Sequence, residues 1–428
     1  MKNINKKVLL ASLIGTSLEF YEFVVYGFLA PIMSPLFFPS TDSFVSLVSG
    51  LGVFALGFFA RPIGGIIFGY IGDSYGRKKA LAFSISLMSI PTCLIGLLPT
   101  YATIGWVAPL LLIVCRLLQG ICTGGEYNGA GIFLVEHTKN GKKGFASGFL
   151  IAGCVIGTFL GSSMSFLVHF FDLSWRWPFL LGIIPGVVGY YIRVSLKESP
   201  VFEEAKKTFM PRTKINLVSA LRAGGIASCA ASLFYFLFIF CNSFIPQVSA
   251  VRQDDIIIIL TVASIAYLVF LIVLGWISDY VGHTIMMKCA ALTTILFIYP
   301  AFSYLVVGKG IAGVVVFLFA FSFLLAAYVA PSHAVMVNFF PVTSRYSRLS
   351  LSYTIGLSLF GGTAPMFSMM IFRELQIPSS STFFVLFCAI LGFFSVYKLP
   401  YEENLNKFRR RLRRLNSNQT NALSPIKL

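Results

Sequence analysis

Long apolar stretches separated by short polar segments make up most of this chain. A helix that crosses a membrane needs about 20 mostly apolar residues. Twelve stretches reach that length: 8–37, 45–71, 80–98, 106–134, 145–170, 177–196, 221–248, 256–278, 285–307, 311–339, 349–371 and 380–399. The pattern predicts an all-α membrane protein with twelve transmembrane helices, six on each side of a central polar stretch at 197–214.

The polar segments also predict the domain organisation. We expect an N-terminal six-helix bundle at 1–196 and a cytoplasmic central loop at 197–220. A C-terminal six-helix bundle at 221–400 and a basic cytoplasmic tail at 401–428 follow. An even number of spans places both termini on the same side of the membrane.

Composition supports a membrane protein and excludes an ordinary soluble enzyme. Of the 428 residues, 57% are hydrophobic and only 11% are charged, against roughly 25% charged residues in soluble domains. Of the 33 Lys and Arg residues, 27 fall in segments assigned to the cytoplasm, seven of them in 193–222, and 4 in the opposite loops. This bias predicts cytoplasmic termini in a multi-pass protein of the cell inner membrane.

The net charge of +17 does not indicate nucleic acid binding, because the basic residues lie between apolar runs. We expect the basic tail to contact anionic lipid instead. The partners expected are the lipid bilayer and a small-molecule metabolite, with the chain as a monomer.

An internal repeat relates the two halves. The segment that begins at Gly69 and carries Asp73, Gly76 and Arg77 recurs 206 residues later around Asp279. Each copy follows the second span of its half, as in transporters built from parallel repeats. We predict a gating loop made of Gly69, Asp73, Gly76, Arg77 and Asp279, with Asp73 accepting backbone N–H groups at the start of a helix.

Five ionisable side chains lie within apolar spans, all in the first half: Glu19, Glu22, Arg61, Arg116 and Glu126. Each costs about 2.5–3.5 kcal/mol or more at the centre of a span. They therefore predict ion pairs, a water-accessible interior, or both. Arg61 and Glu126 lie at similar depths, so an ion pair between them is expected.

Helical spacing places several of these groups on shared faces. Glu19, Glu22 and Tyr26 share one face of the first span. Arg116, Gln119 and Glu126 share one face of the fourth. We assign proton coupling to Glu19, Glu22 and Glu126. We assign substrate binding or charge pairing to Arg116, Arg61, Gln119 and Tyr26. The alternative is that these charges form static pairs that only stabilise the bundle.

Sequence motifs for other chemistries are missing from the chain. It contains no phosphate-binding GxxxxGK[ST] and no HExxH or GxSxG pattern. We therefore expect no enzyme, no catalytic residues, no metal and no cofactor, with protons as the coupling ion.

The motifs together resemble the major facilitator superfamily, and within it the metabolite:proton symporter family. The residues that carry the resemblance are the 69–79 loop, Glu19-Phe-Tyr-Glu22, Arg61-Pro62, Arg116-Leu-Leu-Gln119-Gly120, Trp175-Arg176-Trp-Pro178, Lys197-Glu198-Ser-Pro200 and Arg345-Tyr346-Ser-Arg348. The family includes proline/betaine, 2-oxoglutarate, citrate and shikimate carriers. The resemblance implies the major facilitator fold and proton-coupled import by alternating access.

The substrate implied is a small zwitterionic or anionic metabolite, and a proline/betaine-like osmolyte is favoured. The alternatives are a mono- or dicarboxylate symporter, a drug or metabolite:proton antiporter on the same fold, and a membrane receptor that transports nothing.

Overall fold

The computed structural model describes residues 6–138, 141–207, 216–249, 251–306 and 310–397. The basic tail predicted at 401–428 lies outside these residues, as does the part of the polar stretch from 208 to 214. The described part of the chain is helical throughout, without a β-strand.

In these described ranges, twelve helical segments are long and apolar enough to cross a membrane, which confirms the prediction. The first six consist of α1 (Lys6–Phe37), α2 (Ser43–Ser74), α3 (Arg77–Leu97), α5 (Val107–His137), α6 (Lys143–Phe170) and the pair α7 (Arg176–Leu180) and α8 (Ile183–Val194). Two short helices lie outside the spans: α4 (Tyr101–Ile104) and α9 (Pro200–Lys207).

The second set of spans is more interrupted. It consists of α10 (Leu217–Tyr235) with η1 (Phe236–Phe240) and α11 (Cys241–Val248), α12 (Gln253–Val281), α13 (His283–Val306), α14 (Gly310–Val329) with α15 (Ser332–Met336) and η2 (Val337–Phe339), η3 (Val342–Ser344) with α16 (Arg345–Gly356), η4 (Leu357–Gly361) and α17 (Ala364–Leu375), and η5 (Pro378–Thr382) with α18 (Phe383–Val396). Two of the interruptions, η1 and η4, are π-helical segments, and such segments mark functional positions in many proteins.

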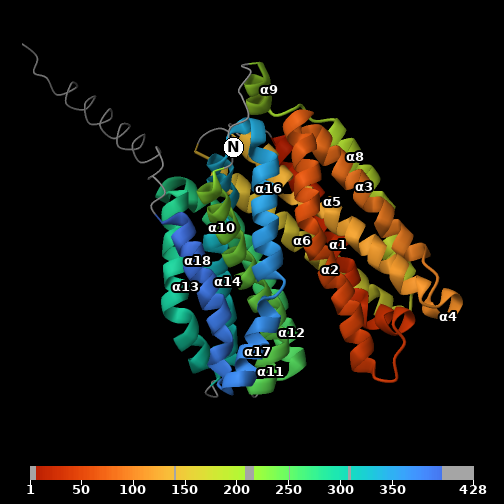
Figure 1. Ribbon diagram of the computed structural model, residues 1–428. Coiled ribbons are helices and arrows are strands. Elements are labelled where there is room, and N and C mark those ends of the chain that lie inside the picture. Colours follow the sequence, from red (N-terminus) through yellow and green to blue (C-terminus); the bar gives the residue numbers. More distant parts are fainter. Residues whose placement is uncertain (1–5, 139–140, 208–215, 250, 307–309, 398–428) are drawn as a thin grey trace, which may run out of the picture.

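Two bundles pack side by side (Figure 1). The first contains α1 to α8 and the second α10 to α18, and they touch along α2 against α16 and α6 against α12. We call the end of the molecule that carries α9 and the start of α1 the linker end, and the opposite end, with α4 and α11, the far end (Figure 1).

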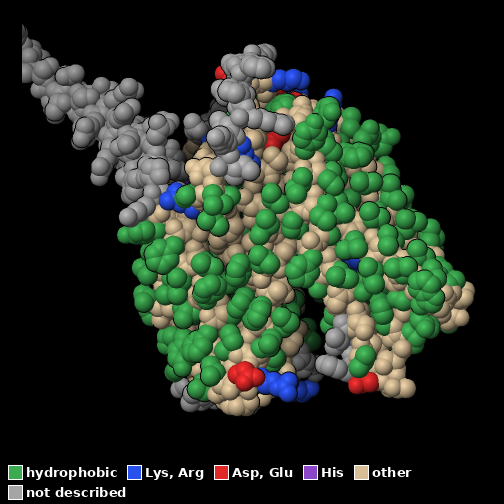
Figure 2. Space-filling view, in the orientation of Figure 1, with side chains coloured by type: hydrophobic (Ala, Val, Ile, Leu, Met, Phe, Trp, Pro, Cys, Tyr) green, Lys and Arg blue, Asp and Glu red, His purple; other side chains and the backbone are tan. Residues whose placement is uncertain are grey.

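The surface has the pattern of a membrane protein. Hydrophobic side chains cover the flank of both bundles, whereas charged side chains gather near the two ends (Figure 2). The same view shows the bundles in contact toward the linker end and separated by a cleft at the far end.

Close helix contact inside the first bundle depends on glycine. A Cβ atom at Gly124 of α5 would overlap the backbone oxygen of Arg61 on α2, and one at Gly120 would overlap that of Gly57. Small residues allow this approach of two membrane helices, where apolar burial alone gives no advantage over lipid. The crossing of α2 and α5 fixes the depth of Arg61 relative to Arg116 and Glu126.

The first prediction concerns this crossing. Gly124→Val should lower the free energy of unfolding by about 1–3 kcal/mol, because overpacking forces the helices apart. The measurement is the apparent unfolding temperature of the purified protein in detergent. Gly52→Val is the matched control, since a Cβ at Gly52 meets no atom within 4 Å. Equal unfolding temperatures for the two variants would contradict the tight crossing.

Candidate transport site

The two bundles are held together at the linker end by Asp73, the last acidic residue of α2. Its Oδ1 accepts the backbone N–H of Tyr346 over 3.0 Å, and its Oδ2 accepts that of Ser347, also over 3.0 Å. These N–H groups belong to the first turn of α16, where a helix has unpaired donors and a positive dipole end. The contact predicted for Asp73 is therefore present, and it joins the two bundles.

The repeated motif makes the same kind of contact from the other side. Asp279, near the end of α12, accepts the backbone N–H groups of Gly144 and Phe145 over 2.8 and 2.9 Å. These residues begin α6 of the first bundle. Each half therefore caps a helix of the other half, as the duplication would require. The position of Arg77 is taken by His283, whose Nε2 lies 3.0 Å from Asp279 Oδ1.

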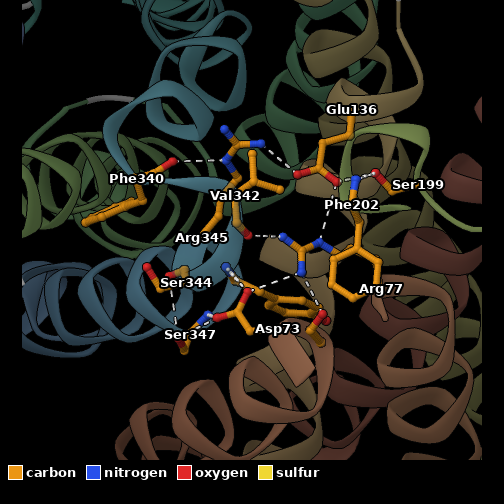
Figure 3. A network of polar contacts seen from close by, with 12 residues as sticks. Asp73, Arg77, Glu136, Ser199, Phe202, Phe340, Val342, Ser344, Arg345 and Ser347 are labelled. Atoms are coloured by element: carbon orange, nitrogen blue, oxygen red, sulfur yellow. Dashed lines mark hydrogen bonds and ion pairs between the residues drawn. The ribbon is translucent and has the colours of Figure 1, made fainter. Parts of the chain in front are cut away.

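Arg77 connects further groups at the linker end (Figure 3). Its Nη2 donates to the backbone oxygen of Val342 in the second bundle, and its Nε lies 3.5 Å from Glu136 Oε2. Glu136 in turn accepts Arg345 Nη1 over 2.7 Å. We call the contacts of Asp73, Asp279, Arg77, Glu136 and Arg345 the linker-end latch.

The two glycines of the predicted gating loop are required by close approach. A Cβ at Gly69 would overlap Ser347 of the second bundle. Gly76 has a φ of 117°, a conformation that L side chains rarely adopt, and a Cβ there would also overlap Glu198. Glu198 accepts the backbone N–H of Arg77 over 3.1 Å at the start of α3.

Contact between the bundles continues to the middle of α2. Ser358 Oγ of η4 donates to the backbone oxygen of Phe58 over 2.7 Å, and the rings of Phe58 and Tyr235 lie 5.8 Å apart. Tyr127 of α5 packs against His333 and Tyr353 of the second bundle, with ring centroids 4.9 and 5.5 Å apart. The rings of five residues therefore form an aromatic layer between the two bundles: Phe58, Tyr127, Tyr235, His333 and Tyr353.

His333 differs from the buried, hydrogen-bonded histidine that is common in cores. Its side chain is fully buried, and neither ring nitrogen has a hydrogen-bond partner among the described residues. It contacts Tyr127 across the bundle boundary, where Gly131 leaves room for the imidazole. The position of this histidine at the boundary did not follow from the sequence.

Besides Arg77 and Glu136 of the latch, six charged residues are buried inside the first bundle, one more than the sequence predicted. We call them the charge cluster: Glu19, Glu22, Glu126, Arg61, Arg116 and Arg193. With every member ionised, three carboxylates balance three guanidinium groups. The added member, Arg193, lies in the last turn of α8 and was assigned to a cytoplasmic segment by its position at the end of an apolar run.

The predicted ion pair between Arg61 and Glu126 is wrong. Glu126 Oε1 accepts Arg193 Nη2 over 2.7 Å, and its Oε2 accepts Ser84 Oγ over 2.9 Å. Equal depth in the membrane does not decide the pairing, because the direction of each side chain around its helix axis matters as much.

Arg61 instead lies against aromatic rings. Its guanidinium carbon is 4.2 Å from the ring centroid of Phe23 and 4.3 Å from that of Phe58. Such cation–π contacts stabilise a charge that is partly removed from water. Arg61 therefore reaches the aromatic layer at the boundary between the bundles.

Glu22 is bound by hydroxyl groups of α3. Ser89 Oγ and Thr92 Oγ1 each donate to one of its carboxylate oxygens over 3.2 Å. Glu22 and Arg116 are connected only indirectly, because Arg116 Nη1 donates to Gln119 Oε1 over 2.7 Å and Gln119 Nε2 donates to Thr92 Oγ1 over 2.8 Å.

Arg116 is fully buried beneath aromatic side chains. Its guanidinium carbon lies 4.7 Å from the ring centroid of Tyr26, and the hydroxyl of Tyr26 donates to the backbone oxygen of Gly50 over 3.0 Å. The Nε and Nη2 atoms of Arg116 have no hydrogen-bond partner among the described residues. Two buried donors are thus available on a guanidinium that no carboxylate of the described chain neutralises directly.

Of the two arrangements predicted for these charges, ion pairs or a water-accessible interior, the second is absent for the three acids in this conformation. Glu19 and Glu22 are each 1% exposed and Glu126 is 0% exposed. Glu22 and Glu126 face α3, inside the first bundle, rather than the boundary with the second. Glu19 has no hydrogen-bond partner for either oxygen among the described residues, and Arg61 is among its charged neighbours.

The second prediction tests the latch. Asp73→Asn should leave one N–H group of the α16 first turn unpaired, at a cost of about 1–3 kcal/mol. A change of this size shifts an opening equilibrium by about 5- to 150-fold. A cysteine is introduced by Ser350→Cys, at a buried position in α16, in the presence and in the absence of Asp73→Asn. The measurement is the rate at which a thiol reagent modifies this cysteine, monitored by mass spectrometry. The exposed Asp172→Asn is the control, and equal rates in the two variants would contradict the latch.

Comparisons with known proteins agree with this architecture. A family model described as sugar (and other) transporter matches residues 7–214. The proline/betaine transporters of Salmonella typhimurium and of Escherichia coli K12 are each 30% identical over 414 residues, which covers 90% of this chain and 82% of theirs. The inner membrane metabolite transport protein YhjE of Escherichia coli K12 is 34% identical over 383 residues, covering 85% of this chain and 87% of its own.

Solved structures show the same fold. A double tryptophan mutant of XylE superposes with a TM-score of 0.78 at 15% identity, covering 92% of this chain and 96% of that one. The proton:xylose symporter XylE bound to 6-bromo-6-deoxy-D-glucose gives a TM-score of 0.72 at 14% identity, covering 91% of this chain and 94% of that one. The predicted fold and family are confirmed: the chain belongs to the major facilitator superfamily and is a multi-pass membrane transporter of small-molecule metabolites.

Proposed function

We propose that this protein imports a small zwitterionic or anionic metabolite together with protons by alternating access, with a proline- or betaine-like osmolyte as the favoured substrate. The observation that carries the proposal is the charge cluster, in which three glutamates are buried in one bundle of a membrane transporter. Such residues are costly in a membrane and are retained in transporters chiefly where they bind substrate or carry protons.

The arrangement of the bundles supports alternating access. The linker-end latch closes one end while a cleft separates the bundles at the far end (Figure 2). A substrate that enters the cleft meets the aromatic layer and Arg61 near the middle of α2. Opening of the latch and closure of the far end would then pass the substrate to the linker side.

Protons are expected to travel by Glu19 and Glu22, with Glu126 as a third acid of the coupling site. Arg61 and Glu19 interact electrostatically, and Arg61 also contacts the aromatic layer. A substrate carboxylate that binds near Arg61 would weaken the attraction of this arginine for a charged Glu19. Glu19 would then keep its proton while the bundles rearrange, so that substrate and proton move together.

The substrate class rests on both chemistry and relatives. Arg116 has two unpaired buried donors, which suit a carboxylate. The rings of Phe23, Tyr26 and Phe54 face this guanidinium and stabilise its charge. Two relatives at 30% identity are named proline/betaine transporters, and both of these compounds carry a carboxylate.

A mono- or dicarboxylate is the second candidate. The observation in its favour is that the charge cluster holds three buried arginines, more than a single carboxylate needs. Export of a metabolite or drug in exchange for protons would use the same fold and differs in the direction of flux.

We place the linker end in the cytoplasm of a cell with the protein in its inner membrane, because basic residues concentrate in the segments that meet at that end. The conformation would then be open to the outside. We expect a monomer whose basic tail at 401–428 contacts anionic lipid.

The third prediction tests proton coupling. In proteoliposomes with an inward proton gradient, the wild-type protein should accumulate labelled proline or glycine betaine. Glu19→Gln and Glu22→Gln should each reduce accumulation to that of protein-free liposomes, because the amide cannot release a proton. Competition by 2-oxoglutarate, citrate and shikimate separates the carboxylate candidates.

Glu374→Gln is the matched control, because this residue is exposed in α17. Gradient-driven accumulation at wild-type level in both Glu19→Gln and Glu22→Gln would remove these residues from the coupling site. Proton-driven loss of substrate would indicate an antiporter, and no flux for any compound of the panel would indicate a receptor.

A further inference from the structure

Arg193 is turned from the end of its helix into the interior of the first bundle. It occupies the last turn of α8 and is 4% exposed. Its Nη2 binds Glu126 Oε1 over 2.7 Å, whereas its Nε is buried without a hydrogen-bond partner among the described residues. A guanidinium has five N–H donors, so Arg193 can bind a second carboxylate without releasing the first.

Gly15 provides the space that Arg193 occupies against α1. A Cβ at Gly15 would overlap Arg193 Nη2 and would lie 3.1 Å from its Cζ. Gly15 precedes Glu19 by four residues, so the two positions are neighbours on one face of α1, about 5–6 Å apart at Cβ. The guanidinium therefore lies one helical turn from Glu19.

Glu19 lacks hydrogen-bond donors within the described part of the chain, whereas Arg193 has one to spare. Both carboxylate oxygens are buried without a donor among the described residues, and Arg193 and Glu126 are among its charged neighbours. A charged carboxylate is costly in such surroundings, so the neutral, protonated form of Glu19 suits this conformation. Glu126, with Arg193 and Ser84 as donors, suits the charged form.

We propose that Arg193 is the positioning residue of the proton-coupling site and that its guanidinium can bind both Glu126 and Glu19. Gly15 leaves the space beside α1 that the guanidinium needs for this. In the conformation described, Arg193 neutralises Glu126 and Glu19 holds the proton. When the bundles rearrange, the proton leaves Glu19 for water on the linker side. Arg193 then extends its free Nε toward the new carboxylate and bridges both acids, while Arg61 supplies the second positive charge.

This inference rests on the proposed function, and transport tests it in three variants. Arg193→Gln should lose proton-driven accumulation of proline or glycine betaine about tenfold or more, yet retain counterflow of labelled substrate, which needs no net proton movement. Arg193→Lys should recover part of the accumulation. Gly15→Ala should reduce accumulation by displacing Arg193, with Gly52→Ala as the control because a Cβ there meets nothing within 4 Å.

A double variant distinguishes coupling from mere structural support. Arg193→Gln combined with Glu126→Gln removes both charges of the pair and should restore stability without restoring accumulation. Recovery of wild-type accumulation in the double variant would overturn the proposal, as would wild-type accumulation in Arg193→Gln. Failure of the wild-type protein to accumulate any substrate would instead count against the proposed function.

Infrared spectroscopy of the purified protein gives a readout that does not depend on transport. The wild-type protein should show the carbonyl band of a buried carboxylic acid, and Glu19→Gln should remove it. Arg193→Gln should add a second such band, because Glu126 loses its counter-ion and takes up a proton. A spectrum unchanged by Glu19→Gln, or by Arg193→Gln, would contradict the shared-arginine arrangement.

Discussion

The cost of charge inside a membrane is the constraint on which the structure of the first bundle depends. Glu19, Glu22 and Glu126 lie in a part of the chain where lipid offers no compensation. The three arginines of the charge cluster and hydroxyl donors from α3 compensate these charges. Compensation is uneven, however, because Glu126 has an ion pair whereas Glu19 has no hydrogen-bond partner among the described residues. A cluster that can gain or lose one proton follows from that imbalance.

The second constraint is that two bundles of an alternating-access transporter must hold together at one end and release there in another state. The duplicated aspartates meet it by capping helices of the opposite bundle, Asp73 on α16 and Asp279 on α6. The two copies of the motif differ in the residue four positions after the aspartate, which is Arg77 in the first half and His283 in the second. Arg77 reaches across to Val342, while its counterpart, His283, contacts Asp279 of its own bundle. Acidic and guanidinium groups are buried within the first bundle, and the second contributes His333 to the boundary.

Much of this architecture can be predicted from the sequence, because it depends on the composition of short segments of the chain. Apolar length predicts the twelve spans, and the repeat around Asp73 and Asp279 predicts which loops join the bundles. The pairing of Glu126 does not follow, because it depends on the rotation of α8 and on the space that Gly15 leaves for Arg193. The burial of Glu22 against α3 could not be predicted from the sequence either, because the polar face of a helix does not indicate which neighbouring helix it contacts.

Substrate-induced proton movement tests the central claim most directly. Proteoliposomes that contain a pH-sensitive dye start with no proton gradient, and proline or glycine betaine is added outside. The account predicts that the interior acidifies as substrate enters through the wild-type protein, and that Glu19→Gln abolishes the signal. Entry of labelled substrate with no change of internal pH would contradict it.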